Sequence, residues 1–214
     1  MRRRQWMLHC SLSALALAGT GLARAATAPR RLLVLGDSLS AEYGLARGSG
    51  WVALLEQKLK AEKIAASVVN ASISGDTTSG GRSRLPALLA QHKPTHLILE
   101  LGGNDALRGL PLAMTRENLL AMTRAAKAAG AKVLLVGMQV PPNYGRAYTE
   151  DFARSFQDVA RERRAGLVPF LLAGVADRPD AEAWFQSDRI HPLAKAHPVM
   201  LDNVWPALKT LLPR

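Results

Sequence analysis

Short apolar runs alternate with longer amphipathic stretches along the chain after about residue 26. The apolar runs are nearly continuous in Val, Leu and Ile, which is typical of strands buried on both faces, as in a parallel sheet. The predicted strands are Arg31–Leu35, Ala65–Asn70, His96–Leu101, Lys132–Gly137 and Gly166–Phe170. Because strands and helical stretches alternate, we expect a right-handed, doubly wound α/β sheet with helices on both faces.

The amphipathic stretches between these runs predict helices. Thr115 and Thr149 are expected to be N-caps, and Gly130 is a typical end signal. Pro198 and Pro206 are expected to kink or interrupt the last helix. The predicted helices are Trp51–Glu62, Gly81–His92, Thr115–Ala129, Thr149–Ala165 and Pro192–Leu212, with loops at Tyr144–Tyr148 and Ala176–Asp180. No repeat or linker divides the chain, so we expect one domain over residues 27–214.

The first 25 residues differ from the rest of the chain. Arg2, Arg3 and Arg4 are followed by an apolar stretch without acidic residues, and Ala23-Arg24-Ala25 matches a small-x-small cleavage site. This pattern is typical of a secretory signal peptide, and the apolar stretch is too short and broken to span a membrane. We therefore predict that residues 1–25 are removed and that the protein is periplasmic or secreted, without stable membrane insertion. An uncleaved anchor is the alternative, and the export route, Sec or twin-arginine, is left open.

Net charge and cysteine content narrow the function classes. The chain carries a net charge of +11, and its single cysteine, Cys10, lies in the predicted signal peptide with four arginines and no acid. The mature chain would therefore carry +7 and no thiol, which excludes a cysteine nucleophile and thiolate metal ligands. Its densest basic run, at residues 161–164, ends a predicted helix, where cations complement the helix dipole. With only 5% aromatic residues available for base stacking, we expect no nucleic-acid partner.

Polar loops containing glycine follow the first three predicted strands. They read GDSLS at 36–40, NASISGDT at 70–77 and GGND at 102–105. In an open parallel sheet, ligands bind outside the carboxyl ends of the strands, so these loops are expected to converge on one site.

Five residues in these loops and near the C-terminus carry the candidate chemistry. Ser38 needs a base to become a nucleophile, and Asp188 and His191 have the spacing of one helical turn, so that the carboxylate can orient the imidazole. The backbone N–H of Gly75 and the side-chain amide of Asn104 can point at a developing oxyanion. Each feature alone also fits a turn, a cap or a surface histidine; their joint order favours catalysis.

In that order, these segments resemble the signature blocks of the SGNH (GDSL-type) hydrolases, and most of all the periplasmic multifunctional acyl-CoA thioesterase/lysophospholipase/arylesterase group. The resemblance implies a three-layer α/β/α sandwich, flavodoxin-like, with about five parallel strands. It implies a catalytic triad of Ser38, Asp188 and His191, and an oxyanion hole formed by Ser38, Gly75 and Asn104. It implies no metal and no cofactor. In this group the segment after the asparagine lines the acyl pocket, so Leu107, Leu110 and Leu112 are expected to contact the acyl chain; a hydrophobic cap over the core is the alternative.

The acidic and histidine residues outside this set are expected to be structural. Asp37 and Asp105 flank the candidate site, and Glu100 lies in an apolar strand, where it needs a partner. His92 and His96 are expected at the surface or at element boundaries.

The leading hypothesis is a serine esterase that hydrolyses carboxylic esters and thioesters of small to medium acyl chains through an acyl-enzyme on Ser38, with lysophospholipid as a candidate substrate. A carbohydrate or peptidoglycan O-deacetylase uses the same triad and is an alternative. From another class, the +7 charge also fits a non-catalytic module that binds an anionic polymer. The oligomeric state, preferred chain length and activity on amino-acid esters are left open.

Overall fold

The computed structural model describes residues 29–212, so the predicted signal peptide lies outside the described residues. A single parallel sheet runs through this part of the chain in the order β2-β1-β3-β4-β5. The strands are β1 (Arg30–Gly36), β2 (Ala66–Asn70), β3 (His96–Glu100), β4 (Lys132–Val136) and β5 (Gly166–Val168).

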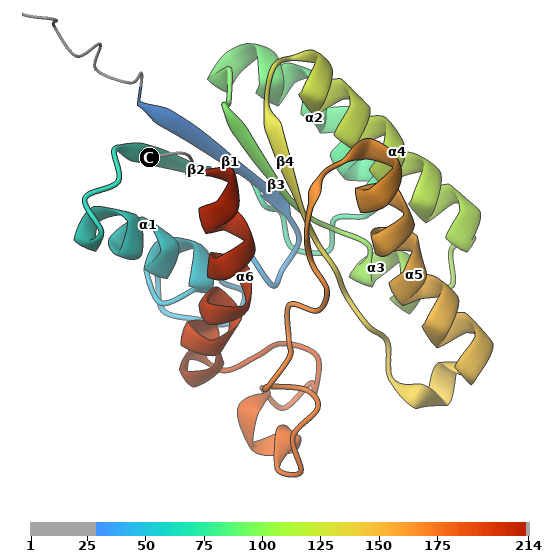
Figure 1. Ribbon diagram of the computed structural model, residues 1–214. Coiled ribbons are helices and arrows are strands. Elements are labelled where there is room, and N and C mark those ends of the chain that lie inside the picture. The colour runs from blue at the N-terminus through green and yellow to red at the C-terminus, as the bar shows by residue number, and fades with distance from the viewer. Residues whose placement is uncertain (1–28, 213–214) are drawn as a thin grey trace, which may run out of the picture.

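Helices cover both faces of the sheet (Figure 1). On one face α1 (Trp51–Ala61) packs beside α6 (His197–Leu211). On the other, α2 (Thr78–His92), α4 (Leu112–Ala128) and α5 (Arg146–Arg163) lie side by side, and α3 (Gly103–Leu107) is a short turn of helix after β3. The predicted three-layer α/β/α sandwich with five parallel strands is therefore confirmed.

The core follows from the apolar strands. Every side chain of β3 is buried, and Leu32–Leu35 of β1 are at most 1% exposed. The central strands thus supply the apolar surface against which both helical layers pack.

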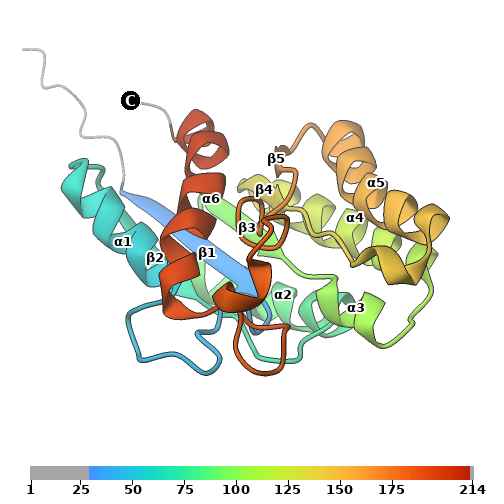
Figure 2. The same ribbon diagram turned by 90° about the horizontal axis from the view of Figure 1, so that it is seen from below.

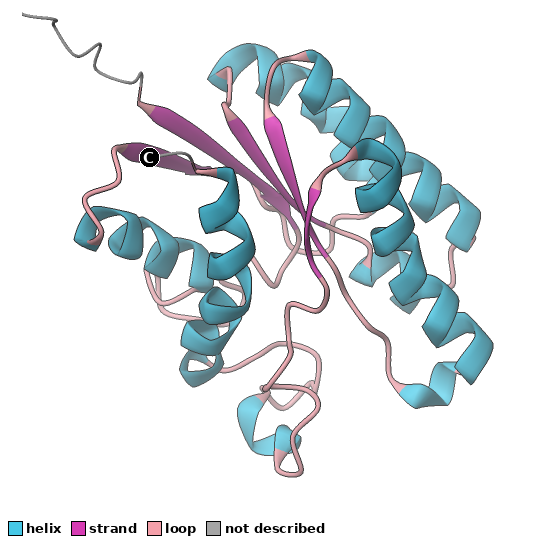
Figure 3. Ribbon diagram, in the orientation of Figure 1, coloured by secondary structure: helices cyan, strands magenta, loops and turns pink. Residues whose placement is uncertain are grey.

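The strand order places the candidate site. After β1 the chain crosses to β2 on one side and then to β3 on the other. The connections that leave the carboxyl ends of β1 and β3 therefore run in opposite directions, which makes this a topological switch point, where open α/β sheets bind ligands. The loops that follow β1, β2 and β3 gather at this edge, together with the segment that precedes α6 (Figure 2). That segment is mostly loop with short helical turns (Figure 3), among them Ala181–Trp184 and Ala194–Ala196.

Several helix boundaries differ from the prediction. α4 begins at Leu112 and α5 at Arg146, so Thr115 and Thr149 are not caps. Thr115 is buried and donates a hydrogen bond to Asp105, whereas Thr149 donates to the carbonyl of Gly145 one turn back. In both cases the helix begins three residues before the threonine. The threonine hydroxyl bonds to another group and does not accept a backbone N–H of the first turn, as an N-cap would. The predicted loop at Tyr144–Tyr148 is accordingly helical from Arg146 onward.

The other helix ends are set by local chemistry. α2 begins earlier than predicted, at Thr78, because the Thr77 hydroxyl accepts the backbone N–H of Gly80 at 3.2 Å. α6 begins at His197 and not at Pro192, so Pro198 lies in the first turn, where a missing N–H costs nothing, and interrupts no helix. Pro206 lies within α6.

His92 is the last residue of α2 and His96 the first of β3, so both lie at element boundaries as predicted. His96 is buried, with Nε2 3.0 Å from the carbonyl oxygen of Leu211. In the part of the chain that the structure describes, no helix is both long enough and apolar enough to cross a membrane.

Candidate active site

The candidate nucleophile lies in a tight turn at the end of β1. The carboxylate of Asp37 accepts the backbone N–H of Leu39 at 3.0 Å, and the carbonyl of Asp37 accepts those of Ser40 and Ala41. These bonds fold the chain around Ser38, which is half-buried at the carboxyl edge of the sheet.

Asp188 and His191 lie in a loop turn and not on a helical turn, which corrects the prediction. Arg189 has a positive φ of 58°, which is incompatible with a continuing helix. One carboxylate oxygen of Asp188 accepts the backbone N–H groups of Ile190 at 2.9 Å and His191 at 3.0 Å. This hydrogen-bonded turn, rather than a helix face, brings the carboxylate back to the imidazole.

A continuous chain of hydrogen bonds joins the three residues. Asp188 Oδ2 lies 2.6 Å from His191 Nδ1, and His191 Nε2 lies 2.8 Å from Ser38 Oγ. Burial opposes ionisation of Asp188, but the hydrogen bonds from the backbone and ring of His191 and from the backbone of Ile190 outweigh it and lower its pKa to about 2. An ionised Asp188 can only accept, so Nδ1 carries the proton and the Nε2 lone pair faces the serine hydroxyl.

Two further residues, which the sequence did not suggest, hold the His191 loop against the loop after β1. The ring of Tyr43, from the loop after β1, lies against the His191 imidazole with centroids 4.2 Å apart. The Gln186 side chain donates to the Tyr43 carbonyl at 2.9 Å, and its backbone N–H donates to the His191 carbonyl at 2.8 Å. Nothing in the local pattern of the sequence points to either residue, because the contact between Gln186 and Tyr43 joins positions 143 residues apart.

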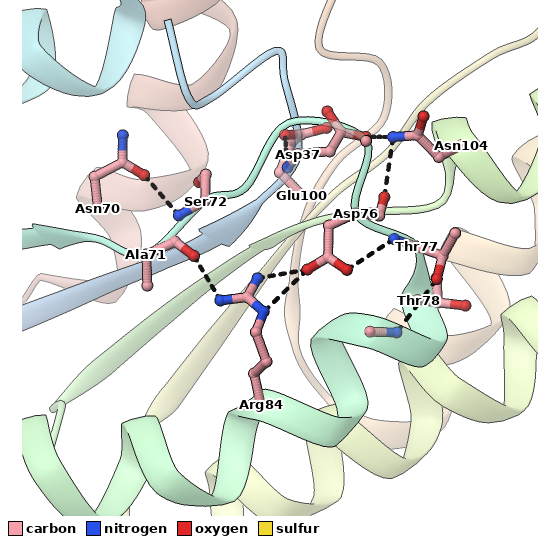
Figure 4. Close-up of polar contacts among 12 residues, drawn as sticks. Asp37, Asn70, Ala71, Ser72, Asp76, Thr77, Thr78, Arg84, Glu100 and Asn104 are labelled. Carbon is pink, nitrogen blue, oxygen red and sulfur yellow. Dashed lines mark hydrogen bonds and ion pairs between the residues drawn. The ribbon is translucent and has the colours of Figure 1, made fainter. Parts of the chain in front are cut away.

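The β2–α2 loop carries Gly75, which has a positive φ of 79° that favours glycine. A cation braces this loop: Arg84 forms an ion pair with the Asp76 carboxylate and donates to the carbonyl of Ala71 at 2.8 Å (Figure 4). The same arginine therefore ties both ends of the loop to α2.

The side chain of Asn104, on α3, reaches across to both neighbouring loops (Figure 4). Its amide nitrogen donates to Asp37 Oδ2 at 3.1 Å and to the carbonyl of Asp76 at 2.9 Å. The structure thus brings Ser38, Asn104 and the Gly75 loop to one edge of the sheet.

Two carboxyl groups are buried beneath the nucleophile turn. Glu100 accepts the hydroxyl of Ser40 at 2.7 Å and the backbone N–H of Asp37 at 3.3 Å, which gives it the partners that its burial requires. Burial, followed by the neighbouring Asp37, raises the pKa of Glu100 well above its ordinary value. Burial also raises the pKa of Asp37, to about 6, against the lowering effect of its hydrogen bonds from Leu39 and Asn104.

Asp105 has a structural environment of its own. Its carboxylate accepts the backbone N–H and hydroxyl of Thr78 and the hydroxyl of Thr115 at 3.1 Å. It therefore joins the start of α2 to α4 and fixes the position of its neighbour Asn104.

The predicted acyl-contact residues span the connection from α3 to α4: Leu107 ends α3, Leu110 lies in the loop, and Leu112 begins α4. Leu107 is 50% exposed, and Leu110 and Leu112 are half-buried. Between them, Arg108 donates to the carbonyl of Gly75 at 2.7 Å, so this loop borders the candidate oxyanion site.

Two open surface hollows lie elsewhere, and neither includes these leucines or Ser38. They are lined by Arg82, Glu117, Leu120, Ala121, Arg124 and Arg163, and by Lys127, Gly130, Ala131, Lys132, Val133, Arg164 and Leu211. Within residues 29–212 no group of three or more His, Asp or Glu side chains is placed to hold a metal ion.

Residues 34–199 match the GDSL-like Lipase/Acylhydrolase family. The chain belongs to this family. It is 52% identical over 185 residues to Esterase TesA of Pseudomonas aeruginosa, an alignment that covers 86% of this chain and 90% of the relative. It is 45% identical over 187 residues to the Escherichia coli K12 protein named Thioesterase 1/protease 1/lysophospholipase L1, with 87% of each chain covered.

A solved structure gives the same result as the sequence relatives. The crystal structure of TesA superposes with a TM-score of 0.82 at 52% identity, covering 86% of this chain and all of that one. This member of the GDSL-like family is therefore a carboxylic ester hydrolase that acts on small-molecule esters or thioesters. The hypothesis of a non-catalytic polymer-binding module is set aside.

Proposed function

We propose that Ser38 is the nucleophile of this esterase and that His191 is its general base and acid. Asp188 orients the imidazole and stabilises the imidazolium that forms. The observation that carries the proposal is the hydrogen-bonded chain from Asp188 through His191 to Ser38, with distances of 2.6 Å and 2.8 Å. These distances are those of a base within direct proton-transfer reach of a hydroxyl.

The reaction then has two halves. As Ser38 Oγ attacks the carbonyl carbon, its proton moves to His191 Nε2, and the imidazolium that forms is stabilised by Asp188. His191 next gives that proton to the departing alcohol or thiol, leaving an acyl-enzyme on Ser38. A water molecule loses a proton to His191, attacks the acyl carbon and releases the acid, while the serine recovers its proton.

The negative oxygen formed in each half needs fixed donors. We propose the backbone N–H groups of Ser38 and Gly75 and the side-chain amide of Asn104 for this role. The positive φ of Gly75 and the convergence of its loop with Asn104 near Ser38 support this assignment.

Labelling with a fluorophosphonate probe tests the nucleophile directly. We expect the label on Ser38, and Ser38→Ala to abolish labelling and lower kcat by about 10⁴–10⁶-fold without unfolding the protein. Ser83→Ala, an exposed serine on α2, is the matched control and should keep both label and activity. A label on another serine would overturn the assignment.

We further propose that the substrates are esters and thioesters of small to medium acyl chains, that lysophospholipid is one of them, and that the enzyme works in the periplasm or outside the cell. The names of the relatives, which include esterase, thioesterase and lysophospholipase, support the substrate class. Comparing p-nitrophenyl acetate, octanoyl esters, lysophospholipid and acetylated sugars tests it. A clear preference for acetylated sugars would favour the O-deacetylase alternative.

A further inference from the structure

Both amide protons of Asn104 are occupied in this structure. One points at Asp37 Oδ2 at 3.1 Å and the other at the carbonyl of Asp76 at 2.9 Å (Figure 4). Both partners are acceptors, so only the NH₂ end of the amide can face them. An oxyanion can therefore bind to this side chain only if one of the two bonds is given up.

The two bonds differ in strength. The Asp76 carbonyl is neutral and belongs to a half-buried loop, whereas the Asp37 carboxylate is 2% exposed. Since the pKa of Asp37 is about 6, this carboxyl is largely ionised at neutral pH and offers Asn104 a charged acceptor. A hydrogen bond to a charged, buried acceptor is about twice as strong as one to a neutral group.

Asp37 also contacts the nucleophile turn. Its other carboxylate oxygen accepts the backbone N–H of Leu39, directly after Ser38. One buried carboxylate thus fixes both the turn that carries Ser38, just after β1, and the side-chain amide of Asn104 on α3.

We propose that Asp37 is a positioning residue that acts through Asn104: its carboxylate holds one amide proton throughout the reaction, while the other is exchanged from the Asp76 carbonyl to the oxyanion. This inference rests on the proposed role of Asn104 in oxyanion binding. The oxyanion takes the place of an acceptor already present, so the donor is aimed before substrate arrives and little reorganisation is needed.

A double-mutant cycle tests whether Asp37 acts through Asn104. In Asp37→Asn the amide oxygen can still accept from Leu39, but its NH₂ group then opposes that of Asn104. We expect kcat for p-nitrophenyl acetate to fall about 10- to 100-fold with little change in KM, the range for losing a hydrogen bond to a charged group. Asn104→Ala should lower kcat about 10²–10³-fold.

The decisive value is the effect of Asp37→Asn in the Asn104→Ala background, which we expect to be less than about 3-fold, as for residues that act as a unit. Equal factors in both backgrounds, or no effect of Asp37→Asn alone, would overturn the inference. Asp158→Asn, a half-buried carboxylate on α5 that pairs with Arg161 outside the candidate site, is the matched control and should leave kcat unchanged.

A measurement on the wild-type protein guards against misfolding of the variants. The two side-chain amide protons of Asn104 give separate NMR signals, identified by their loss in Asn104→Ala. When a fluorophosphonate modifies the nucleophile, we expect the proton that faces Asp76 to shift and the one that faces Asp37 to stay. A shift of the Asp37-facing proton alone would overturn the exchange. Failure of the proposed function would differ, because the probe would then not label Ser38.

Discussion

The substitution Asp188→Asn tests the orientation of the imidazole, because the surrounding backbone dictates how the new side chain lies. The N–H groups of Ile190 and His191 both point at one oxygen of Asp188. In the variant, the amide oxygen must stay with these two donors, so the NH₂ group faces His191 Nδ1. The ring then has to carry its proton on Nε2, which points at Ser38 and can no longer accept.

We expect kcat to fall on the order of 10⁴-fold, the loss seen when the same substitution imposes the wrong tautomer in a serine protease. At about 1.36 kcal/mol for each tenfold, this is about 5 kcal/mol of transition-state stabilisation. KM should change little, because the carboxylate faces the imidazole and not the substrate. The Asp188 side chain is 36% exposed, so the loss of folding stability should stay below about 1 kcal/mol.

The assay compares kcat and KM for p-nitrophenyl acetate with the thermal midpoint of each protein. Asp180→Asn is the matched control, because this nearby loop aspartate pairs with Arg178 and not with a histidine. It should keep wild-type kcat. A kcat for Asp188→Asn within tenfold of wild type, in a folded protein, would refute the reasoning.

Three further predictions follow from particular residues. Gly75→Ala should cost about 1–2 kcal/mol of stability because φ is +79°, and should lower kcat about tenfold because the backbone N–H moves. The control is Gly48→Ala, where φ is +87° and the space around the glycine is open; it should cost similar stability and leave kcat unchanged. Equal kinetics in both variants would contradict a role for the Gly75 loop. Leu110→Asp should weaken hydrolysis of octanoyl esters more than that of acetates, and equal losses would reject an acyl contact. Because burial raises the pKa of Asp37 from 3.8 to about 6, the folded state binds its proton more tightly, so the free energy of unfolding should fall as pH rises from about 4 to 6; urea denaturation of Asp37→Asn should lack this component.

The sheet could be predicted from the sequence because its strands are buried on both faces. Their short, nearly continuous apolar runs are typical of buried parallel strands, and the glycine-containing loops after β1, β2 and β3 mark where these strands end. The helix starts were less predictable. Threonine is a common N-cap, but the Thr115 hydroxyl bonds to Asp105, a partner that only tertiary packing brings close. Local propensity carries no information about such a partner.

The site was predictable where residues are close in the chain or belong to a recognisable block. The approach of His191 to Ser38 followed from the resemblance and not from any local pattern. Tyr43 and Gln186 were missed because their interaction exists only after the ends of the chain meet. The direction in which Asn104 points was equally hidden, since it depends on a carboxylate 67 residues away.

The hydroxyl and the imidazole at this site are separated by 153 positions, and the imidazole comes just before the final helix. That helix is seated on α1, where the ring of His197 accepts the backbone N–H of Trp51 at 3.0 Å. On the proposed mechanism, a chain that has not yet docked its last helix has every strand of the sheet but lacks its general base, because His191 is not yet held beside Ser38. On that mechanism, the appearance of turnover during refolding reports the docking of α6 on α1, and a nascent chain without this helix is inactive.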